Sequence, residues 1–497
     1  MSIRQVRRLK LFILVLIGVL FAKIFITLVS LPKITVDYVA AYNEYTKPVA
    51  FTAADNAADY YYQARRLYKE PPEELDSSAL LLKWREDRTP FFEGINPDDL
   101  QLLEKWLQSN KPAFDQIKLA IQKPYSWFER KSETGNTLHI IFEEFASIRD
   151  LSHALIYSAK VNAINNNFTG AANNITDCYQ IGQHKCRENL SLMDQAHGLR
   201  IKNEATKAAL AILAYSKPAA EELKSFQDSL QTIVDEDSYL PGFTAEKIFK
   251  YDLVQRLYLD WIRGINRPAF RIMRQIKCMC DDNNFMWVNA FVGPSRTEII
   301  SQIEHLFELH ELLRDKTPWQ IHHQYSNLTS EIEAMNGDDF FGEFFATSYY
   351  RYFSEYYESK VQTDALITIL AALRFKADNN KLPGTLDELV SKGYMKTVPQ
   401  DPYSREDLVY QVIDNDFRLY SVGKDFEDNN GEATTVERDE MFGFESMDTY
   451  EMPAMPPAPL PDPPAGKKTI WKVYKDIMYW PVERNGTRYS LRGFRSN

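Results

Sequence analysis

The sequence has few glycines, and it contains none of the glycine-rich loops that bind phosphate groups. Only 19 of its 497 residues are glycine, and neither a phosphate-cradling loop nor a Gly-x-Ser-x-Gly nucleophile elbow is present. These absences argue against nucleotide-dependent enzymes and serine hydrolases of the common kinds. Because no other catalytic motif stands out, we expect a protein that is not an enzyme, and we identify no small-molecule substrate.

Acidic residues are missing from the start of the chain, whereas the rest is strongly acidic. The first carboxylate is Asp37, and the formal net charge of the whole chain is −11. The basic residues before Asp37 are Arg4, Arg7, Arg8, Lys10, Lys23 and Lys33. Phosphate contacts need clustered lysine and arginine, so an acidic body argues against binding to nucleic acid.

One long apolar segment follows the basic N-terminus. Residues Leu11 to Leu31 contain a single charge, Lys23, and an apolar helix of roughly 20 residues crosses the hydrocarbon core of a bilayer. A cleavable signal peptide would have a shorter apolar centre and a small-x-small exit, whereas Ser30-Leu31-Pro32 is a poor cleavage site. The sequence therefore predicts a transmembrane anchor at 11–31.

The charge around this segment predicts its orientation. Basic flanks stay on the cytoplasmic side of a membrane, so residues 1–10 should be cytoplasmic and the bulk of the chain extracytoplasmic. We expect a single-pass protein of the cell inner membrane with a large periplasmic part.

Cysteine is also scarce, and its spacing matches no familiar metal or redox motif. An exported compartment permits disulfides, and four cysteines allow three pairings. We interpret the thiols as structural, whether oxidised or not. The four residues are Cys178, Cys186, Cys278 and Cys280.

Between residues 39 and 345 the pattern is that of amphipathic helices. Apolar residues recur at three- and four-residue spacing, and prolines interrupt the pattern, as at Pro112, Pro124 and Pro218. Asn96-Pro97-Asp98-Asp99 is a strong helix start, with a capping side chain followed by proline in the first turn. Because no repeat of fixed length emerges, we predict an irregular α-helical domain at 39–345.

The C-terminal part has a different pattern. A long helix is predicted from about Ser348 to Ala377, and Val409–Ile413 and Phe417–Val422 read as a β-hairpin. Seven prolines fall within 453–464, which indicates an extended insertion, and residues 469–489 are strand-like. The predicted fold is thus mainly α, ending in a small α+β module formed by 348–430 plus 469–489.

Several short motifs follow one another in this module. They are the helix end Ala371–Asn379, Leu382-Pro383, the turn Val398–Tyr403, Val409-Tyr410, Phe417–Asp425, and Asp476-Ile477-Met478-Tyr479-Trp480. Together they resemble the pattern of the globular domain of the major pseudopilin of type II secretion systems. The upstream part more loosely resembles bacterial envelope proteins in which a helical domain precedes the same module.

The N-terminus departs from the pattern of a pilus subunit. A prepilin carries a Gly-Phe-x-x-x-Glu cleavage site just before its apolar helix, whereas Arg8-Leu9-Lys10-Leu11 stands here. We therefore interpret the module as borrowed, and expect a role in protein interaction, assembly or secretion with protein partners. A membrane-tethered hydrolase acting on envelope polymers and a divergent minor pseudopilin are the alternatives.

The resemblance also implies a calcium site. The family binds the ion in the loop that follows the Tyr-Ser-x-Gly strand, and calcium prefers clustered carboxylate and carbonyl oxygens. The residues that match are Asp425, Asp428 and Asn430, with Asp476 at the family's second acidic position. A solvated turn is the alternative, because Asp and Asn are favoured in turns for backbone reasons alone.

The sequence offers two further groups of residues as candidate sites. His305, Glu308, His310 and Glu311 lie on one predicted helix but lack the His-Glu-x-x-His spacing of zinc proteases, so we interpret this helix as exposed and charged. A second group lies near one face of the next predicted helix, which favours packing against the upstream domain; a binding surface for sugar or peptide is the alternative. This group consists of Tyr349, Phe353, Tyr356 and Tyr357.

Overall fold

The computed structural model describes residues 3–29, 31–85, 92–236, 240–259, 294–336, 350–431, 433–437, 470–474 and 477–481, together with Gly342 and Phe345. The described part is mainly helical, with a small antiparallel sheet near its C-terminal end. The prediction of a mainly α fold with an α+β end is therefore confirmed at this level. The proline-rich stretch 453–464, Cys278 and Cys280 lie outside the described residues.

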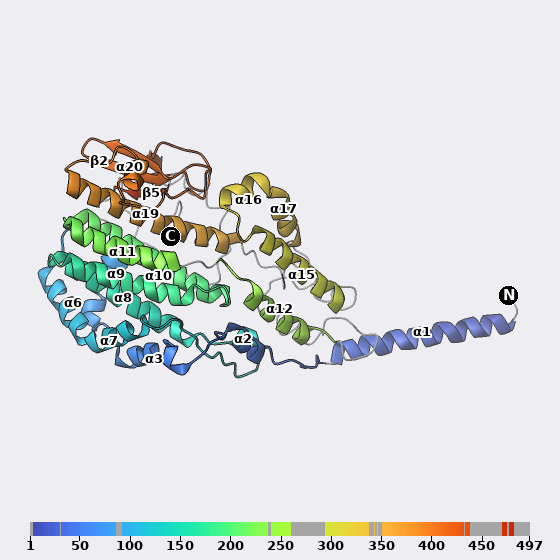
Figure 1. Cartoon of the computed structure of the whole chain (residues 1–497). Coiled ribbons are helices and arrows are strands. Elements are labelled where there is room, and N and C mark those ends of the chain that lie inside the picture. The colour runs from blue at the N-terminus through green and yellow to red at the C-terminus, as the bar shows by residue number, and fades with distance from the viewer. Residues whose placement is uncertain are drawn as a thin grey trace.

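The N-terminal helix α1 (Ile3–Val29) projects away from the rest of the molecule (Figure 1). Among the described residues, no helix combines the length and the apolar character needed to cross a membrane. The side chain of Asp37 accepts a hydrogen bond from the amide of Ala40 and so caps the next helix, α2 (Tyr38–Thr46).

The helical body is built around three long helices that pack side by side, α8 (Glu143–Ile164), α9 (Phe168–Lys185) and α10 (Leu192–Tyr215). Helices α9 and α10 approach closely because Gly182 and Gly198 face each other. A Cβ added at Gly198 would lie 2.5 Å from the carbonyl oxygen of Gly182, so larger residues would push the helices apart.

Shorter helices surround this centre. The predicted start at Asn96 is confirmed, because its side chain accepts a hydrogen bond from the amide of Asp98 at 3.0 Å. The surrounding elements are η1 (Ala53–Asp55), α3 (Ala58–Leu67), α4 (Glu73–Asp76), α5 (Ala79–Arg85), α6 (Pro97–Ser109), α7 (Lys111–Ala120), η2 (Thr137–His139), α11 (Ala220–Glu236), α12 (Thr244–Leu257), α15 (Arg296–Leu313), α16 (Pro318–Gln324) and α17 (Ser326–Met335).

The C-terminal module begins with the longest helix, α19 (Tyr350–Asn379), which is followed by α20 (Leu386–Ser391). Strands β1 (Val409–Ile413) and β2 (Asp416–Ser421) form the predicted hairpin, and β5 (Ile477–Trp480) pairs with the other edge of β2. A separate ribbon joins β3 (Ala433–Glu437) to β4 (Ile470–Tyr474). All three pairings are antiparallel.

Helix α19 belongs to both parts of the protein. It packs on α10 and α11 along one side and on β2 and β5 along the other, which places the module directly on the helical body (Figure 1). The largest hydrophobic core accordingly runs without interruption from Leu155 and Leu210 in the body through Leu370 to Phe417 and Trp480 in the sheet.

The aromatic residues at the start of α19 pack as the sequence predicted. Phe353 and Tyr357 are buried, and the ring of Phe353 lies 5.4 Å from that of Phe243, which precedes α12. The hydroxyl of Tyr352 donates to the side chain of Gln195 on α10 at 2.9 Å. Tyr349 lies outside the described residues.

Candidate functional site

Four ionised side chains meet in the interior of the helical body. They come from four segments: Arg130 from the loop after α7, Glu144 from the first turn of α8, Lys185 from the last turn of α9, and Asp194 from the first turn of α10. Each side chain is at most 5% exposed. We call these four residues the buried ion cluster.

The geometry of the cluster pairs each cation with both anions. The Arg130 guanidinium lies 2.8 Å from the carboxylate of Glu144 and 2.8 Å from that of Asp194. The Lys185 ammonium lies 2.6 Å from Glu144 and 3.2 Å from Asp194. Two positive and two negative charges therefore balance within hydrogen-bond distance, as buried charges require.

Aromatic rings and polar groups complete the surroundings of the cluster. The Arg130 guanidinium carbon lies 4.2 Å from the centre of the Phe142 ring, and the Lys185 ammonium lies 4.5 Å from that of Phe128, distances at which rings attract cations. Asp194 accepts further hydrogen bonds from the hydroxyl of Ser191 at 2.7 Å and from that of Tyr42 at 3.4 Å.

The two carboxylates of the cluster remain ionised despite their burial. Burial alone would raise the pKa of Asp194, but Arg130 and Lys185 attract its charge strongly enough to hold that pKa below the ordinary value. The pKa of Glu144 is lowered as well, with burial again opposed by Lys185 and Arg130. The arrangement is thus a closed set of ion pairs that holds four segments together, rather than a set of groups poised for proton transfer.

A separate hollow of about 550 Å³ lies at the seam between the helical body and the module. Helix α16 forms one wall, α19 another, and the turn at residues 397–405 the third. Gln320 and Gln324 line it from α16, and Lys360 and Asp364, which pair at 2.9 Å, line it from α19. Because pockets between domains commonly bind partners or ligands, we take this seam hollow as the candidate interaction site.

The buried side chain of Asp401 fixes the turn that lines the hollow. The buried carboxylate of Asp401 accepts hydrogen bonds from the amide of Val422 at 2.9 Å and from the hydroxyl of Ser421 at 2.8 Å, both at the end of β2. On its outer side the guanidinium carbon of Arg405 lies 4.1 Å from the centre of the Trp319 ring of α16. These contacts hold the turn at 397–405 against α16 of the helical body.

The predicted calcium ligands occupy the loop after β2. Asp425 accepts hydrogen bonds at 3.2 Å from the amide of Glu427 and from the side chain of Asn429. One oxygen of Asp428 accepts from the Tyr420 hydroxyl at 3.0 Å and from the amide of Asn430 at 2.8 Å. Both carboxylates therefore accept hydrogen bonds from the loop itself, and Asp428 also accepts one from β2.

The fourth predicted ligand, Asp476, lies outside the described residues, so the closed site cannot be assembled from the loop alone. The carbonyl of Asn430 is already engaged, since it accepts from the guanidinium of Arg418 at 3.2 Å. Within the described ranges, no three carboxylate, imidazole or thiol groups come together as a metal site would require. Calcium binding stays a prediction.

The helix predicted to be exposed and charged is only partly so. His305 is on the surface and pairs with Glu331 of α17 at 2.7 Å, but His310 is 1% exposed and hydrogen-bonds to the carbonyl of Leu306 at 2.7 Å. The prediction was therefore wrong for His310, because α15 buries one face against α12. The two histidines point in different directions and do not share a site.

The histidine pair of α16 helps to join the two parts of the protein. The His323 ring stacks on Trp319 with ring centres 4.5 Å apart, and the His322 ring stacks on Phe426 of the loop after β2 at 4.5 Å.

The described cysteines are structural, as predicted: Cys178 and Cys186 are buried and donate to the carbonyls of Ser152 and Gln195.

Sequence reasoning missed the buried ion cluster. Nothing in the sequence linked Glu144 to Arg130 or Asp194. The only available signal was the placement of Glu144 and Asp194 in first helical turns and of Lys185 in a last turn, which favourable helix dipoles explain equally well.

Comparison of the chain with protein-family models, with curated proteins and with solved structures finds no match.

The buried ion cluster makes a testable prediction about stability. Lys185→Met should lower the free energy of unfolding by about 3–5 kcal/mol at neutral pH, because it leaves a buried carboxylate uncompensated. Thermal and denaturant unfolding of the full chain in detergent would measure the loss. Lys224→Met, which removes an exposed ion pair with Asp228, is the matched control and should change little.

The same variant should respond to pH in a defined direction. The pKa values of Glu144 and Asp194 are lowered by folding, so the stability they contribute is complete above their unfolded values near pH 4 and is lost as the pH falls through the folded values. The cost of Lys185→Met should therefore shrink in acid. A cost that is equal at pH 7 and pH 3 would contradict the ionised assignment.

Proposed function

We propose that this chain is a non-enzymatic, membrane-anchored envelope protein whose helical body and pseudopilin-like module hold protein partners outside the membrane. The observation that carries the anchor is the surface of α1. Its large apolar side chains are exposed, among them Leu11, Phe12, Leu14, Leu20 and Phe21, each 58–67% accessible. No other described element covers this helix, and lipid is the solvent that such a surface fits.

The charge on α1 supports the orientation given to it. Arg7 and Lys10 are exposed and stand just before the apolar residues, and acidic residues are missing from the helix. Basic flanks of this kind are retained in the cytoplasm. The body that follows α1 would then lie on the opposite side of the inner membrane, in the periplasm.

The pseudopilin-like role rests on how the residues of that pattern are assembled. The rings of Phe417 and Trp480 stack with centres 5.7 Å apart, and the Trp480 ring nitrogen donates to Asp416 at 2.9 Å. Asp401 joins the turn at 397–405 to the end of β2. The pattern residues thus form one compact unit, which supports a folded module borrowed for interaction.

The seam hollow supports a binding role for this module. Its walls come from both the body and the module, so a partner seated there would read both at once. Its lining mixes amide, hydroxyl, cationic and aromatic side chains, which is the composition of protein-interaction surfaces rather than of a dry apolar pocket.

The anchor can be tested by extraction of membranes at alkaline pH, which releases peripheral proteins. The full chain should remain in the membrane pellet, whereas Leu20→Arg combined with Phe21→Arg should shift it to the soluble fraction, because two charges at mid-membrane oppose insertion. Leu82→Arg, on the exposed side of α5, is the control and should stay in the pellet. Release of the unaltered chain would overturn the anchor.

The partner role can be tested by photo-crosslinking in cells. A photoreactive phenylalanine analogue at Gln324, inside the seam hollow, should give a discrete adduct, and Arg405→Glu should reduce it because that substitution reverses the charge beside Trp319. The same analogue at Lys224, on the far side of α11, should not give this adduct. Identical adducts from both positions, or none from Gln324, would contradict the proposal.

Calcium is the cofactor proposed for the module. If the loop after β2 binds the ion, calcium should raise the midpoint of thermal unfolding relative to a chelator by mass action. Asp425→Ala should abolish this increase, and Asp228→Ala on α11 should preserve it. An unaltered chain that melts identically with and without calcium would rule the site out.

A further inference from the structure

The segment that joins α1 to the body is short and firmly held. The amides of Thr35 and Val36 both donate to the side-chain oxygen of Gln255 at 3.2 Å, and the side-chain nitrogen of Gln255 donates back to the carbonyl of Val36 at 2.8 Å. Gln255 is itself buried on α12. The side-chain amide of Gln255 thus holds the joining segment through three hydrogen bonds to its backbone.

This clamp sets how far the body can stand from the end of α1. Helix α1 ends at Val29 and the clamp begins at Thr35. Six residues of fully extended chain span at most about 20 Å. If α1 lies in a bilayer, as proposed above, the end of the body around α12 must lie at or very near the membrane surface.

Exposed apolar side chains gather at this same end of the body. In the joining segment Leu31, Ile34 and Val36 are 43–51% accessible. Leu138 and Ile141, on and just after η2, are each 61% accessible. We call these five residues the apolar collar.

The two halves of the collar are brought together by α12. The amide and the hydroxyl of Thr137, beside Leu138, donate to the buried carboxylate of Asp252 at 2.8 and 2.9 Å. Asp252 lies one turn before Gln255, which holds Val36, and the two side chains are hydrogen-bonded at 2.9 Å. The position of Leu138 relative to the joining segment is therefore fixed.

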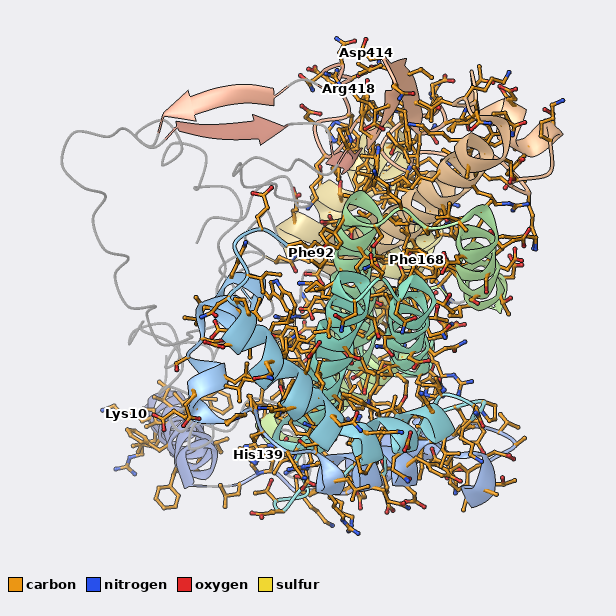
Figure 2. The ribbon with its side chains drawn as sticks, turned by 90° about the vertical axis from the view of Figure 1, so that its left-hand side faces the viewer. Lys10, Phe92, His139, Phe168, Asp414 and Arg418 are labelled. Atoms are coloured by element: carbon orange, nitrogen blue, oxygen red, sulfur yellow. The ribbon has the colours of Figure 1, made fainter. Side chains whose placement is uncertain are left out.

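The views of the molecule agree with this placement. Figure 1 shows the joining segment running from α1 to α2 beside the end of α12. In Figure 2 the labelled His139, the neighbour of Leu138, lies at the lower side of the molecule, far from Asp414 and Arg418 of the β1–β2 hairpin at the top.

We propose that the apolar collar is a second membrane contact, which inserts into the interfacial region of the outer leaflet of the membrane that holds α1. This inference rests on the proposed anchor. The tether brings the collar to the lipid surface, and its apolar side chains then leave water by entering the boundary between headgroups and acyl chains. Exposed Lys33, in the same segment, can extend its ammonium toward the headgroups.

The contact gives the body a fixed stance on the membrane. A single helix followed by a loose linker would let the body rotate and tilt, whereas a helix and a collar joined through α12 leave one orientation. The elements of the module lie away from α1 in Figure 1. The module, and the seam hollow that it lines together with α16, would then face the compartment rather than the lipid.

The test uses the full chain reconstituted into lipid vesicles. Tryptophan is introduced at Leu138 or at Ile141, and the added fluorescence is compared with that of the unaltered chain in ordinary lipids and in lipids brominated near the top of the acyl chains. For a collar seated roughly 5–10 Å into the interface, bromination should quench the added signal strongly. Val412→Trp on β1 and Leu82→Trp on α5 are the controls, because both positions are apolar and exposed but lie outside the collar. They should show no such quenching.

The outcomes separate this inference from the anchor on which it rests. Vesicle flotation reports the anchor directly, so a chain that fails to float overturns both. A chain that floats, but whose tryptophan at 138 is quenched no more than that at 412, retains the anchor and loses the collar. In the same vesicles, acrylamide added to the aqueous phase reports whether the added tryptophan is exposed to water. If it is shielded from acrylamide but not quenched by brominated lipid, protein rather than lipid covers the collar, and the inference is overturned.

Discussion

The fold depends on a neutral set of four charges buried where it is most costly to place them. Arg130, Glu144, Lys185 and Asp194 cannot keep their ionised states in the interior unless all four are present, since each cation contacts both anions. The desolvation cost of such a set is large, and well-packed apolar residues would often be as stable. The distinctive property of the set is therefore its specificity, because only one arrangement of the four segments pairs every charge.

That arrangement reaches the segment nearest to α1. Tyr42 of α2 donates to Asp194, and the side chain of its neighbour Asn43 forms two hydrogen bonds with the backbone of Arg130, at 2.7 and 2.8 Å. Helix α2 is thus held against the ion cluster, while the residues just before it are held by Gln255. The path from α1 to the centre of the body contains no long unsupported stretch among its described residues, so a force or tilt applied to α1 would be transmitted to the α8–α10 centre.

The sequence predicted what local patterns control and missed what distant residues build. The cap at Asn96, the hairpin at 409–421 and the packing of Phe353 and Tyr357 follow from spacing within a few residues of each other. The ion cluster joins residues 9 to 64 positions apart, and each member alone resembles an ordinary charge at a helix end. His310 was misjudged for a related reason: its neighbours on α15 are charged, but α12 covers the face on which it lies.

The candidate site shows the same division between local and distant information. The sequence identified the loop at 425–430 from its acidic and amide residues, and the structure confirms that these side chains share one loop. It could not identify the seam hollow, because the walls come from α16, α19 and the turn at 397–405, whose relative placement depends on packing.

Helix α19 is the element that makes this packing possible. One of its sides carries Leu366 and Leu370 into the core shared with the helical body, and the module's sheet packs on the other. A module with its own core could be transferred to any anchor and would present the same surface wherever it was placed. Here the body supplies one wall of the hollow, and His322 and Trp319 of α16 contact Phe426 and Arg405 of the module. The surface of the hollow is therefore a property of this combination of body and module, because neither part alone forms it.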